Sequence, residues 1–308
     1  MSIFTIIIPC FNAERHLADA LNSLLAQSFT EWQAILVDDG STDGTTAIIA
    51  TYCAIDTRFS TFRQENLGPS IARNRAAQLP SKSEYIAFLD ADDLWTPEKL
   101  SLTLRTFNSP SQPDVVYGIV NFFTRNPRST KTKSTPPKGR LGLAEVIGEN
   151  PVCTLSNLSI RRALFLENGG FNVTMRHSED LEFLIRIIVA GAHIKSINTL
   201  LVHYRTRAEG LSANLWEMHL GWRRAIASAA ALSKAEINYA EAIHLRYLAR
   251  RALRTKAAPL IATKLALHGF RKSPRVFLMS PYRGWATLLA CLIAPFLPAQ
   301  IRHMAFSE

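Results

Sequence analysis

Residues 34–41 read AILVDDGS, an apolar run from Ala34 to Val37 that ends on two aspartates. A similar run, Tyr85 to Leu89, ends on the acidic segment Asp90-Ala91-Asp92-Asp93, and Phe4 to Ile8 is the first such run of the chain. Short runs rich in Ile, Val and aromatic residues are typical of strands buried on both faces. Because open α/β sheets bind ligands at the carboxyl ends of their strands, the sequence predicts an acidic active site at that edge.

Helical patterns lie between these runs. Residues 13–27 place Leu17, Leu21 and Leu24 on one face, and residues 42–52 predict a second helix that Ser41 or Thr42 caps. Strand alternating with helix is typical of a parallel sheet, so we expect an α/β fold with a mostly parallel central sheet. From Leu215 onward the pattern is helical, which predicts a C-terminal helical appendage.

The positive charge of the chain is concentrated at its C-terminal end. Residues 1–210 carry 21 Lys and Arg against 21 Asp and Glu, whereas residues 211–308 carry 14 against 4. We therefore predict two domains, a catalytic domain over residues 1–210 and a basic, helical region over residues 211–308. A neutral catalytic region with a basic tail fits an anionic membrane surface that is met at one end.

An uncharged stretch of 18 residues, GWATLLACLIAPFLPAQI, occupies residues 284–301. Its length reaches the lower edge of a membrane span, but Pro295 and Pro298 count against a straight helix. We therefore rank an interfacial or re-entrant segment first, a core helix of the appendage second and a transmembrane helix third.

The four cysteines are too widely spaced for a zinc site or a disulfide framework. The N-terminus has no basic leader, and its apolar run is too short for a signal peptide. We expect a cytoplasmic protein, peripheral on the inner face of the cell membrane.

Residues 124–140, TRNPRSTKTKSTPPKGR, lack aliphatic side chains and are rich in Lys and Arg. This composition predicts a mobile loop. The loop is either a solvated surface excursion or a flap over the active site.

Five segments share an order and spacing with a known family: TIIIPCFN at residues 5–12, VDDGSTD at 37–43, NLGPSIARN at 66–74, YIAFLDADD at 85–93, and Glu179-Asp180. In this order they resemble glycosyltransferase family 2, inverting enzymes of the GT-A fold. The resemblance covers about residues 3–205 and does not extend to the tail.

The resemblance implies a uridine nucleotide bound by Pro9, Phe11, Asp39, Arg73 and Asp90. Phe11 follows the first strand and could stack on the base. Asp39 could accept a hydrogen bond from the imide N–H of uracil, which cytosine lacks. The Arg73 guanidinium suits phosphate or base oxygens, and Asp38 is expected to be structural or to face the ribose.

Asp90-Ala91-Asp92 resembles the DxD motif. A diphosphate leaving group gains negative charge as the sugar bond breaks, and a hard divalent cation held by carboxylate and phosphate oxygens lowers that barrier. We therefore expect Mn²⁺ or Mg²⁺, with Asp92 as its protein ligand and Asp90 reaching the ribose or, through water, the metal. His203, like His177, is a candidate additional ligand.

An inverting transfer needs one base for the acceptor hydroxyl, and Asp180 matches the aspartate of the family's ED motif. Glu179 is expected to contact the acceptor or to act as an N-terminal charge on its helix. Asp93 is expected to touch the donor sugar or to cap the helix that begins near Pro97. Asn157, with Gly169 and Gly170, is expected to build the acceptor-side wall.

The resemblance implies a metal-dependent hexosyltransferase. Its donor would be a UDP-sugar and its acceptor a hydroxyl of a saccharide or lipid-linked molecule in cell-surface polysaccharide synthesis. A sugar-nucleotide pyrophosphorylase is one alternative, but it would show a glycine-rich basic loop where this chain has Cys10-Phe11-Asn12-Ala13-Glu14. A non-enzymatic nucleic-acid-binding protein is the other; it predicts salt-sensitive binding to DNA or RNA without a response to UDP. We expect no nucleic-acid partner.

Overall fold

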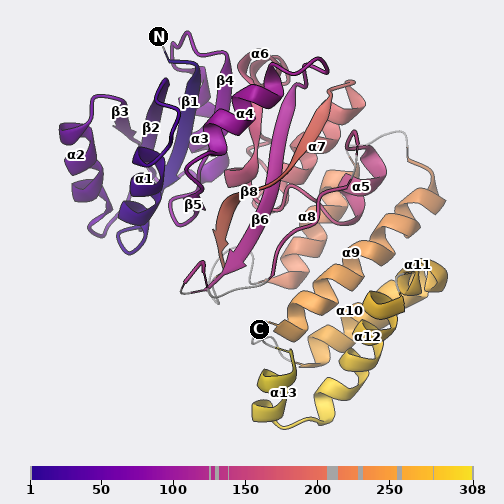
Figure 1. The fold of residues 1–308 in the computed structure, drawn as a ribbon. Helices are drawn as coiled ribbons and strands as arrows, with labels where there is room; N and C mark the ends of the chain where they lie inside the picture. The colour runs from indigo at the N-terminus through magenta and orange to yellow at the C-terminus, as the bar shows by residue number, and fades with distance from the viewer. Residues whose placement is uncertain are drawn as a thin grey trace. The chain divides into compact units, whose positions relative to one another are not determined.

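The computed structural model describes residues 2–124, 126–128, 132–137, 139–206, 214–227, 232–254, 259–279 and 281–306, without the side chains of 281, 282, 299, 303 and 304. The chain divides into two compact units (Figure 1): Met1–Leu141 with Pro151–Thr206, and Gly142–Asn150 with Arg207–Glu308. The predicted boundary between residues 210 and 211 lies outside the described residues. The segment 142–150, which we assigned to the catalytic domain from sequence, belongs to the second unit.

Within the described residues the first unit is built on an eight-stranded sheet in the order β3-β2-β1-β4-β7-β6-β8-β5. Neighbours from β3 to β4 pair in parallel, as do β6 and β8, whereas β7 and β5 run antiparallel to their partners. The predicted α/β fold with a mostly parallel sheet is thereby confirmed. The strands are β1 (Phe4–Cys10), β2 (Trp32–Asp38), β3 (Phe59–Arg63), β4 (Tyr85–Phe88), β5 (Leu94–Trp95), β6 (Val115–Phe123), β7 (Ser159–Arg161) and β8 (Ile194–Arg205).

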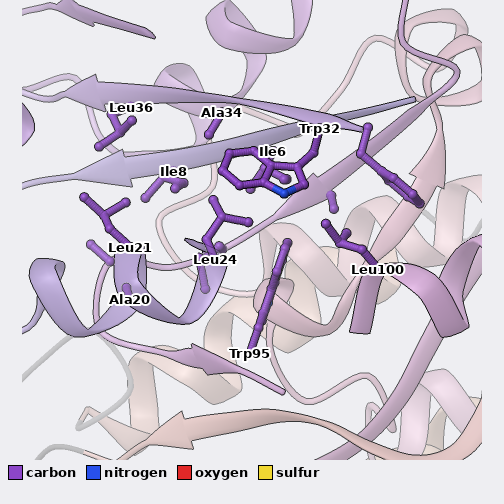
Figure 2. Packing of buried hydrophobic residues seen from close by; sticks show 14 of the residues in the cluster. Ile6, Ile8, Ala20, Leu21, Leu24, Trp32, Ala34, Leu36, Trp95 and Leu100 are labelled. Carbon is purple, nitrogen blue, oxygen red and sulfur yellow. The ribbon is translucent and has the colours of Figure 1, made fainter. Parts of the chain in front are cut away.

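One face of the sheet packs on helices α1 (Leu17–Leu25) and α4 (Lys99–Phe107). Successive side chains of a strand point to opposite faces, so Ile6, Ile8, Ala34 and Leu36 all reach this side. Figure 2 shows them together with residues from both helices and from β5, among them Leu21, Leu24, Trp95 and Leu100. Helix α2 (Thr45–Ile55) begins three residues later than we predicted, because the Ser41 and Thr42 amides donate to Asp38 and Asn12 instead.

On the other face lie α3 (Pro69–Gln78), α6 (Arg162–Glu167) and α7 (Glu179–Val189). Four aromatic rings pack there with centroids 5.1–5.4 Å apart: Phe88 of β4, Phe165 of α6, Phe171, and Phe183 of α7. Leu181, Leu184 and Ile187 of α7 are also buried. The cluster holds the first turn of α7, with Glu179 and Asp180, against the strand that precedes Asp90.

The predicted loop 124–140 is described only in part, with residues 125, 129–131 and 138 outside the description. Its residues 132–134 turn back along β6: the Phe122 amide donates to Thr132 O (3.0 Å) and the Ser134 amide to Val120 O (2.8 Å). Arg140 donates to Gly191 O and Ala192 O (2.8 and 3.0 Å). A role as a flap stays a prediction.

The described secondary structure of the second unit consists of helices. Leu245, Leu248, Leu265 and Phe277 centre its core, and Gly269 lies so near α9 that an added Cβ would sit 2.9 Å from Leu245 Cβ. No described helix combines the length and apolar character needed to cross a membrane. The helices are α5 (Leu143–Gly148), α8 (Leu215–Ala227), α9 (Lys234–Arg254), α10 (Pro259–Lys272), α11 (Pro274–Leu278), α12 (Pro281–Ile293), the 3₁₀ turn η3 (Ala294–Phe296) and α13 (Ala299–Phe306).

Candidate functional site

The acidic motifs lie at one edge of the sheet. β1, β2 and β4 are parallel, with Cys10 opposite Asp38 and Ile7 opposite Phe88, so their carboxyl ends meet there. Phe11, Asp39 and Asp90 follow these three strands. The strand order therefore brings together residues that are up to 79 positions apart in the sequence.

Asp39 is buried and held by the turn that leads into α3. Its Oδ1 accepts hydrogen bonds from the Leu67 amide (2.9 Å) and from Gln64 Nε2 (2.7 Å), and its Oδ2 accepts one from the Gly68 amide (2.9 Å). Gly68 has φ +91°, a conformation that glycine adopts readily. These donors fix the direction of the Asp39 carboxylate, which retains lone-pair capacity for one further donor.

Asp38 has a structural environment. Burial alone would raise its pKa, but hydrogen bonds from the Thr46 hydroxyl (2.6 Å) and the Ser41 amide (2.9 Å) outweigh it, and the pKa lies below its ordinary value. The carboxylate thereby fixes the start of α2 behind Asp39.

Phe11 is not part of the core. It is 47% exposed at the end of β1, while Pro9 is partly buried within the strand. Asn12 adopts φ 47° and accepts a hydrogen bond from the Thr42 amide (2.9 Å), which turns the chain away from the sheet. The Phe11 ring is therefore presented at the strand edge, where a planar base could stack on it.

The buried Asp93 carboxylate supports the Asp90–Asp92 segment that follows β4. This carboxylate is fully buried and accepts from the Ser156 hydroxyl (2.6 Å), the Thr154 hydroxyl (3.2 Å) and the Arg205 amide (2.9 Å). Burial, together with the charges of Asp90 and Asp92, raises its pKa well above the ordinary value. In this arrangement Asp93 supports the Asp90–Asp92 segment and is not open to a sugar.

Arg205, at the end of β8, completes that support. Its Nε donates to the Asp92 carbonyl (2.9 Å), and Nη2 lies 3.3 Å from Asp19 Oδ2. The guanidinium also stands over the Phe123 ring, 4.6 Å from its centroid. Three elements, α1, β6 and β8, are thus tied to the backbone of the DxD segment.

Arg73 joins three of the predicted motifs. Its Nη2 donates to Asp90 Oδ1 (2.6 Å), and its Nη1 lies 3.6 Å from Glu179 Oε1. The Arg73 guanidinium is buried. One side chain of α3 therefore bridges the carboxyl end of β4 and the N-terminus of α7.

The two carboxyl groups at the start of α7 are harder to ionise than usual. Burial and the neighbouring Asp180 raise the pKa of Glu179 to about 7, against the attraction of Arg73. Burial likewise raises the pKa of Asp180, while Arg73 lowers it. Raised pKa values on carboxyl groups near the ends of parallel strands are typical of groups that exchange protons.

Two predicted residues are engaged elsewhere. Asn157 is fully buried and clamps β6, with its Oδ1 accepting from the Gly118 amide and its Nδ2 donating to Gly118 O (both 2.9 Å). His203 Nδ1 lies 3.0 Å from Asn121 Nδ2, and burial lowers the pKa of its ring. His203 is opposite Leu94 in the β5–β8 pair, and Leu94 lies two residues after Asp92 in the sequence. His177 precedes α7 and is partly buried.

The sequence also matches a family model. The model described as Glycosyl transferase family 2 fits residues 5–169, which is more than half of the chain. The chain belongs to glycosyl transferase family 2. The matched residues include every predicted nucleotide residue and Asp92, but neither of the candidate ligands His177 and His203, and they end before the Glu179-Asp180 pair.

Two curated relatives resemble parts of this family 2 chain. TuaG of Bacillus subtilis, assigned to teichuronic acid biosynthesis, is 41% identical over 103 residues, which are 33% of this chain and 40% of TuaG. The poly(ribitol-phosphate) β-N-acetylglucosaminyltransferase TarS of Staphylococcus aureus is 26% identical over 215 residues, 68% of this chain and 36% of TarS. The chain thus spans less than half the length of either relative.

Solved structures share the fold of this chain. S. aureus TarS 1–349 in complex with UDP-GlcNAc superposes with a TM-score of 0.61 at 21% identity, covering 94% of this chain and 89% of that one. The mannosyltransferase PcManGT of Pyrobaculum calidifontis, in complex with GDP-Man and Mn²⁺, gives 0.60 at 19%, covering 96% and 86%. The overall architecture is therefore that of these enzymes.

The residues present suit a metal that is shared with a ligand. Among the described residues, no three His, Cys, Asp or Glu side chains are arranged to hold a metal ion by themselves. Carboxylate oxygens are nevertheless the donors that Mg²⁺ and Mn²⁺ prefer, and Asp90 is partly exposed beside Asp92. The site fits a cation whose other ligands come from a diphosphate.

Sequence reasoning missed the residues that hold the site in shape. Gln64 binds Asp39, and Thr154, Ser156 and Arg205 bind the DxD segment. A polar residue next to a motif is a weak signal, because Ser and Thr are common in any loop. Only Arg205, a charged residue at the end of an apolar strand, offered a detectable hint.

Proposed function

We propose that this protein is an inverting, metal-dependent glycosyltransferase that moves a sugar from a UDP-sugar to a hydroxyl of a saccharide or lipid-linked acceptor. The observation that carries the proposal is the Arg73 bridge between Asp90 and Glu179. Arg73 contacts both the DxD segment and the ED pair, which supports a shared site for a single displacement at one sugar carbon.

The donor end of the proposed site is built from residues of fixed direction. Asp39 is aimed by three hydrogen bonds and would accept from the uracil imide, while the exposed Phe11 ring would stack on the base. Pro9 would shape the edge of the base site. Support for UDP comes from TarS, which was solved with UDP-GlcNAc.

The carboxylates of the DxD segment explain the expected metal. Asp90 and Asp92 would place negative charge where the diphosphate binds, so an anionic diphosphate would be repelled without an added cation. Asp92, with Asp90, would hold Mn²⁺ or Mg²⁺, which would neutralise charge on the leaving UDP. His203 remains a candidate further ligand, and Mn²⁺ is present in PcManGT.

In the proposed reaction Asp180 removes the proton of the acceptor hydroxyl. The acceptor oxygen forms a bond to the anomeric carbon as the bond to UDP breaks, so the configuration at that carbon inverts. Burial raises the pKa of Glu179 to about 7, so its protonated form is populated near neutral pH and would donate a hydrogen bond to the acceptor. Asp93 and Asn157 would not contact the sugars directly. They would hold in place the segments that line the sugar sites.

We further propose a cytoplasmic setting and a role in cell-surface polysaccharide synthesis, supported by the names of TuaG and TarS. Family membership favours a transferase over the pyrophosphorylase and over the nucleic-acid-binding protein. The two domains proposed from sequence, 1–210 and 211–308, would divide catalysis from attachment.

Calorimetry of UDP-sugar binding tests the division of labour in this site. We expect Asp92→Asn to weaken binding about 10- to 100-fold and to abolish its dependence on Mn²⁺, because one charged ligand is lost. Asp39→Asn should weaken binding by a similar factor yet keep the response to Mn²⁺, since its amide group would face the Leu67 and Gly68 donors.

Glu98→Gln provides the control, because Glu98 is exposed on the same stretch of chain and should bind as the unmodified protein does. If the unmodified protein binds UDP equally well with and without Mn²⁺, the proposed metal site is wrong.

A further inference from the structure

The outward face of α12 and η3 is apolar, and we call it the apolar stripe. Its side chains are between 41% and 86% exposed: Trp285, Leu289, Leu292, Ile293 and Phe296. Their spacing of four, three, one and three residues places them on one side of a helix. All five are aliphatic or aromatic side chains, whose transfer out of water lowers the free energy.

The opposite face of the same helix is already used. Gly284, Leu288 and Cys291 are buried, and Cys291 O accepts a hydrogen bond from the Thr263 hydroxyl of α10. α12 is therefore a packed helix of the second unit with an uncovered outer side, and the core-helix interpretation of residues 284–301 explains only its inner side. Contiguous exposed apolar surface of this kind marks an interaction site.

The net charge of the region that carries the stripe indicates which kind of partner the stripe binds. Residues 259–306 contain six Lys and Arg and no Asp or Glu. Lys264, Arg271, Arg275 and Arg283 are exposed. A second copy of this chain would bring the same positive charge against it and would be repelled, whereas an anionic surface would be attracted.

Arg246, Arg250 and Arg254 recur every four residues on α9, but they present less positive charge to a partner than this spacing indicates. Arg246 is buried and donates to Val276 O (3.2 Å) and Phe277 O (3.0 Å), so it caps α11 and does not face a partner. The available positive charge lies instead on α10, α11 and the first turn of α12.

We propose that the apolar stripe inserts into the headgroup boundary of a membrane that contains anionic lipids. Exposed Lys and Arg side chains of residues 259–306 bind the phosphates, and the exposed Trp285 ring lies at the level of the headgroups. The helix lies in the interface and does not cross it, in keeping with its 13 residues. This inference rests on the second unit alone and holds whatever sugar the first unit transfers.

Vesicle flotation of the full chain tests the proposal. The unmodified protein should float with vesicles of phosphatidylcholine and phosphatidylglycerol, and binding should fall with added salt and on vesicles of phosphatidylcholine alone. The triple variant Leu289→Ser, Ile293→Ser, Phe296→Ser should bind anionic vesicles at least about 100-fold more weakly, because three inserting side chains are lost.

A matched variant, Ile55→Ser, Leu79→Ser, Val189→Ser, removes three exposed apolar side chains of the first unit and should float as the unmodified protein does. Circular dichroism and UDP binding of both variants report whether they are folded and whether the nucleotide site is intact, independently of the vesicles. Equal flotation of the two variants overturns the proposal. It is also overturned if the unmodified protein floats with neither kind of vesicle, or if it self-associates through the stripe.

Discussion

Asp180→Asn is expected to slow sugar transfer by about 10² to 10⁴-fold while UDP affinity stays nearly unchanged. The amide keeps the shape of the side chain but cannot accept the proton of the acceptor hydroxyl. Asp180 lies in the first turn of α7, whereas the groups that hold Asp39 come from Gln64, Leu67 and Gly68, so its loss leaves the uracil contacts in place. Initial rates of UDP release, together with calorimetric titration by UDP, separate the two effects.

Glu167→Gln serves as the control for this prediction, because Glu167 is an exposed carboxylate of the neighbouring helix α6. It should transfer sugar at the rate of the unmodified protein. Turnover of Asp180→Asn within a few-fold of normal would show that another group is the base.

Arg73→Met is expected to lower the stability of the fold and to move the acid limb of the rate profile to higher pH. Removing one partner of a buried ion pair leaves the Asp90 and Glu179 carboxylates uncompensated, which costs about 3 kcal/mol in the free energy of unfolding. Chemical denaturation measures this loss.

The direction of the pH shift follows from the base. Transfer needs Asp180 as a carboxylate, so the rate falls as the pH drops through its pKa. Burial raises the pKa of Asp180 and Arg73 opposes that rise, so removal of the guanidinium raises the pKa further and the rate is lost at a higher pH. Arg105→Met, at an exposed arginine of α4, should change neither quantity. An acid limb that stays in place, or that moves to lower pH, would remove Arg73 from the proton balance of the site.

The strand ends could be predicted because a buried strand is a run of apolar residues, and the acidic residues that follow it are strongly polar. Asp39 and Asp90 follow apolar runs, and the parallel pairing of β1, β2 and β4 brings those run ends to one edge. Local patterns of this kind depend on neighbours in the sequence. The buried face of α7 is marked in the sequence in a similar way, since Leu181, Leu184 and Ile187 are spaced as on one face of a helix and all three are buried.

The bridges across the site could not be predicted, because they depend on contacts between distant segments. Arg73 meets Asp90 and Glu179 only once α3 and α7 have packed on the same face of the sheet. The burial of Asp93 likewise depends on Ser156 and Arg205, which lie 63 and 112 positions away. A triplet of acidic residues looks equally exposed in a sequence, whichever of its members the fold encloses.

The tail shows the same limit. An uncharged stretch of 18 residues indicates an apolar segment, but its sequence does not say which side is covered. Folding assigns Leu288 and Cys291 to the core of the second unit and leaves Leu289 and Phe296 outside. The segment 142–150 joins that unit for a similar reason, because Trp222 donates to the Ile147 carbonyl (2.7 Å).

The most direct test of the account is release of nucleotide from a panel of UDP-, GDP-, CDP- and dTDP-sugars, with and without Mn²⁺, followed by NMR assignment of the anomeric configuration in the product. The account predicts that UDP is released from a UDP-sugar, that release needs Mn²⁺ or Mg²⁺ and an acceptor hydroxyl, and that the new linkage has the inverted configuration. A product with retained configuration, release of pyrophosphate in place of UDP, or equal turnover of a GDP-sugar would contradict it.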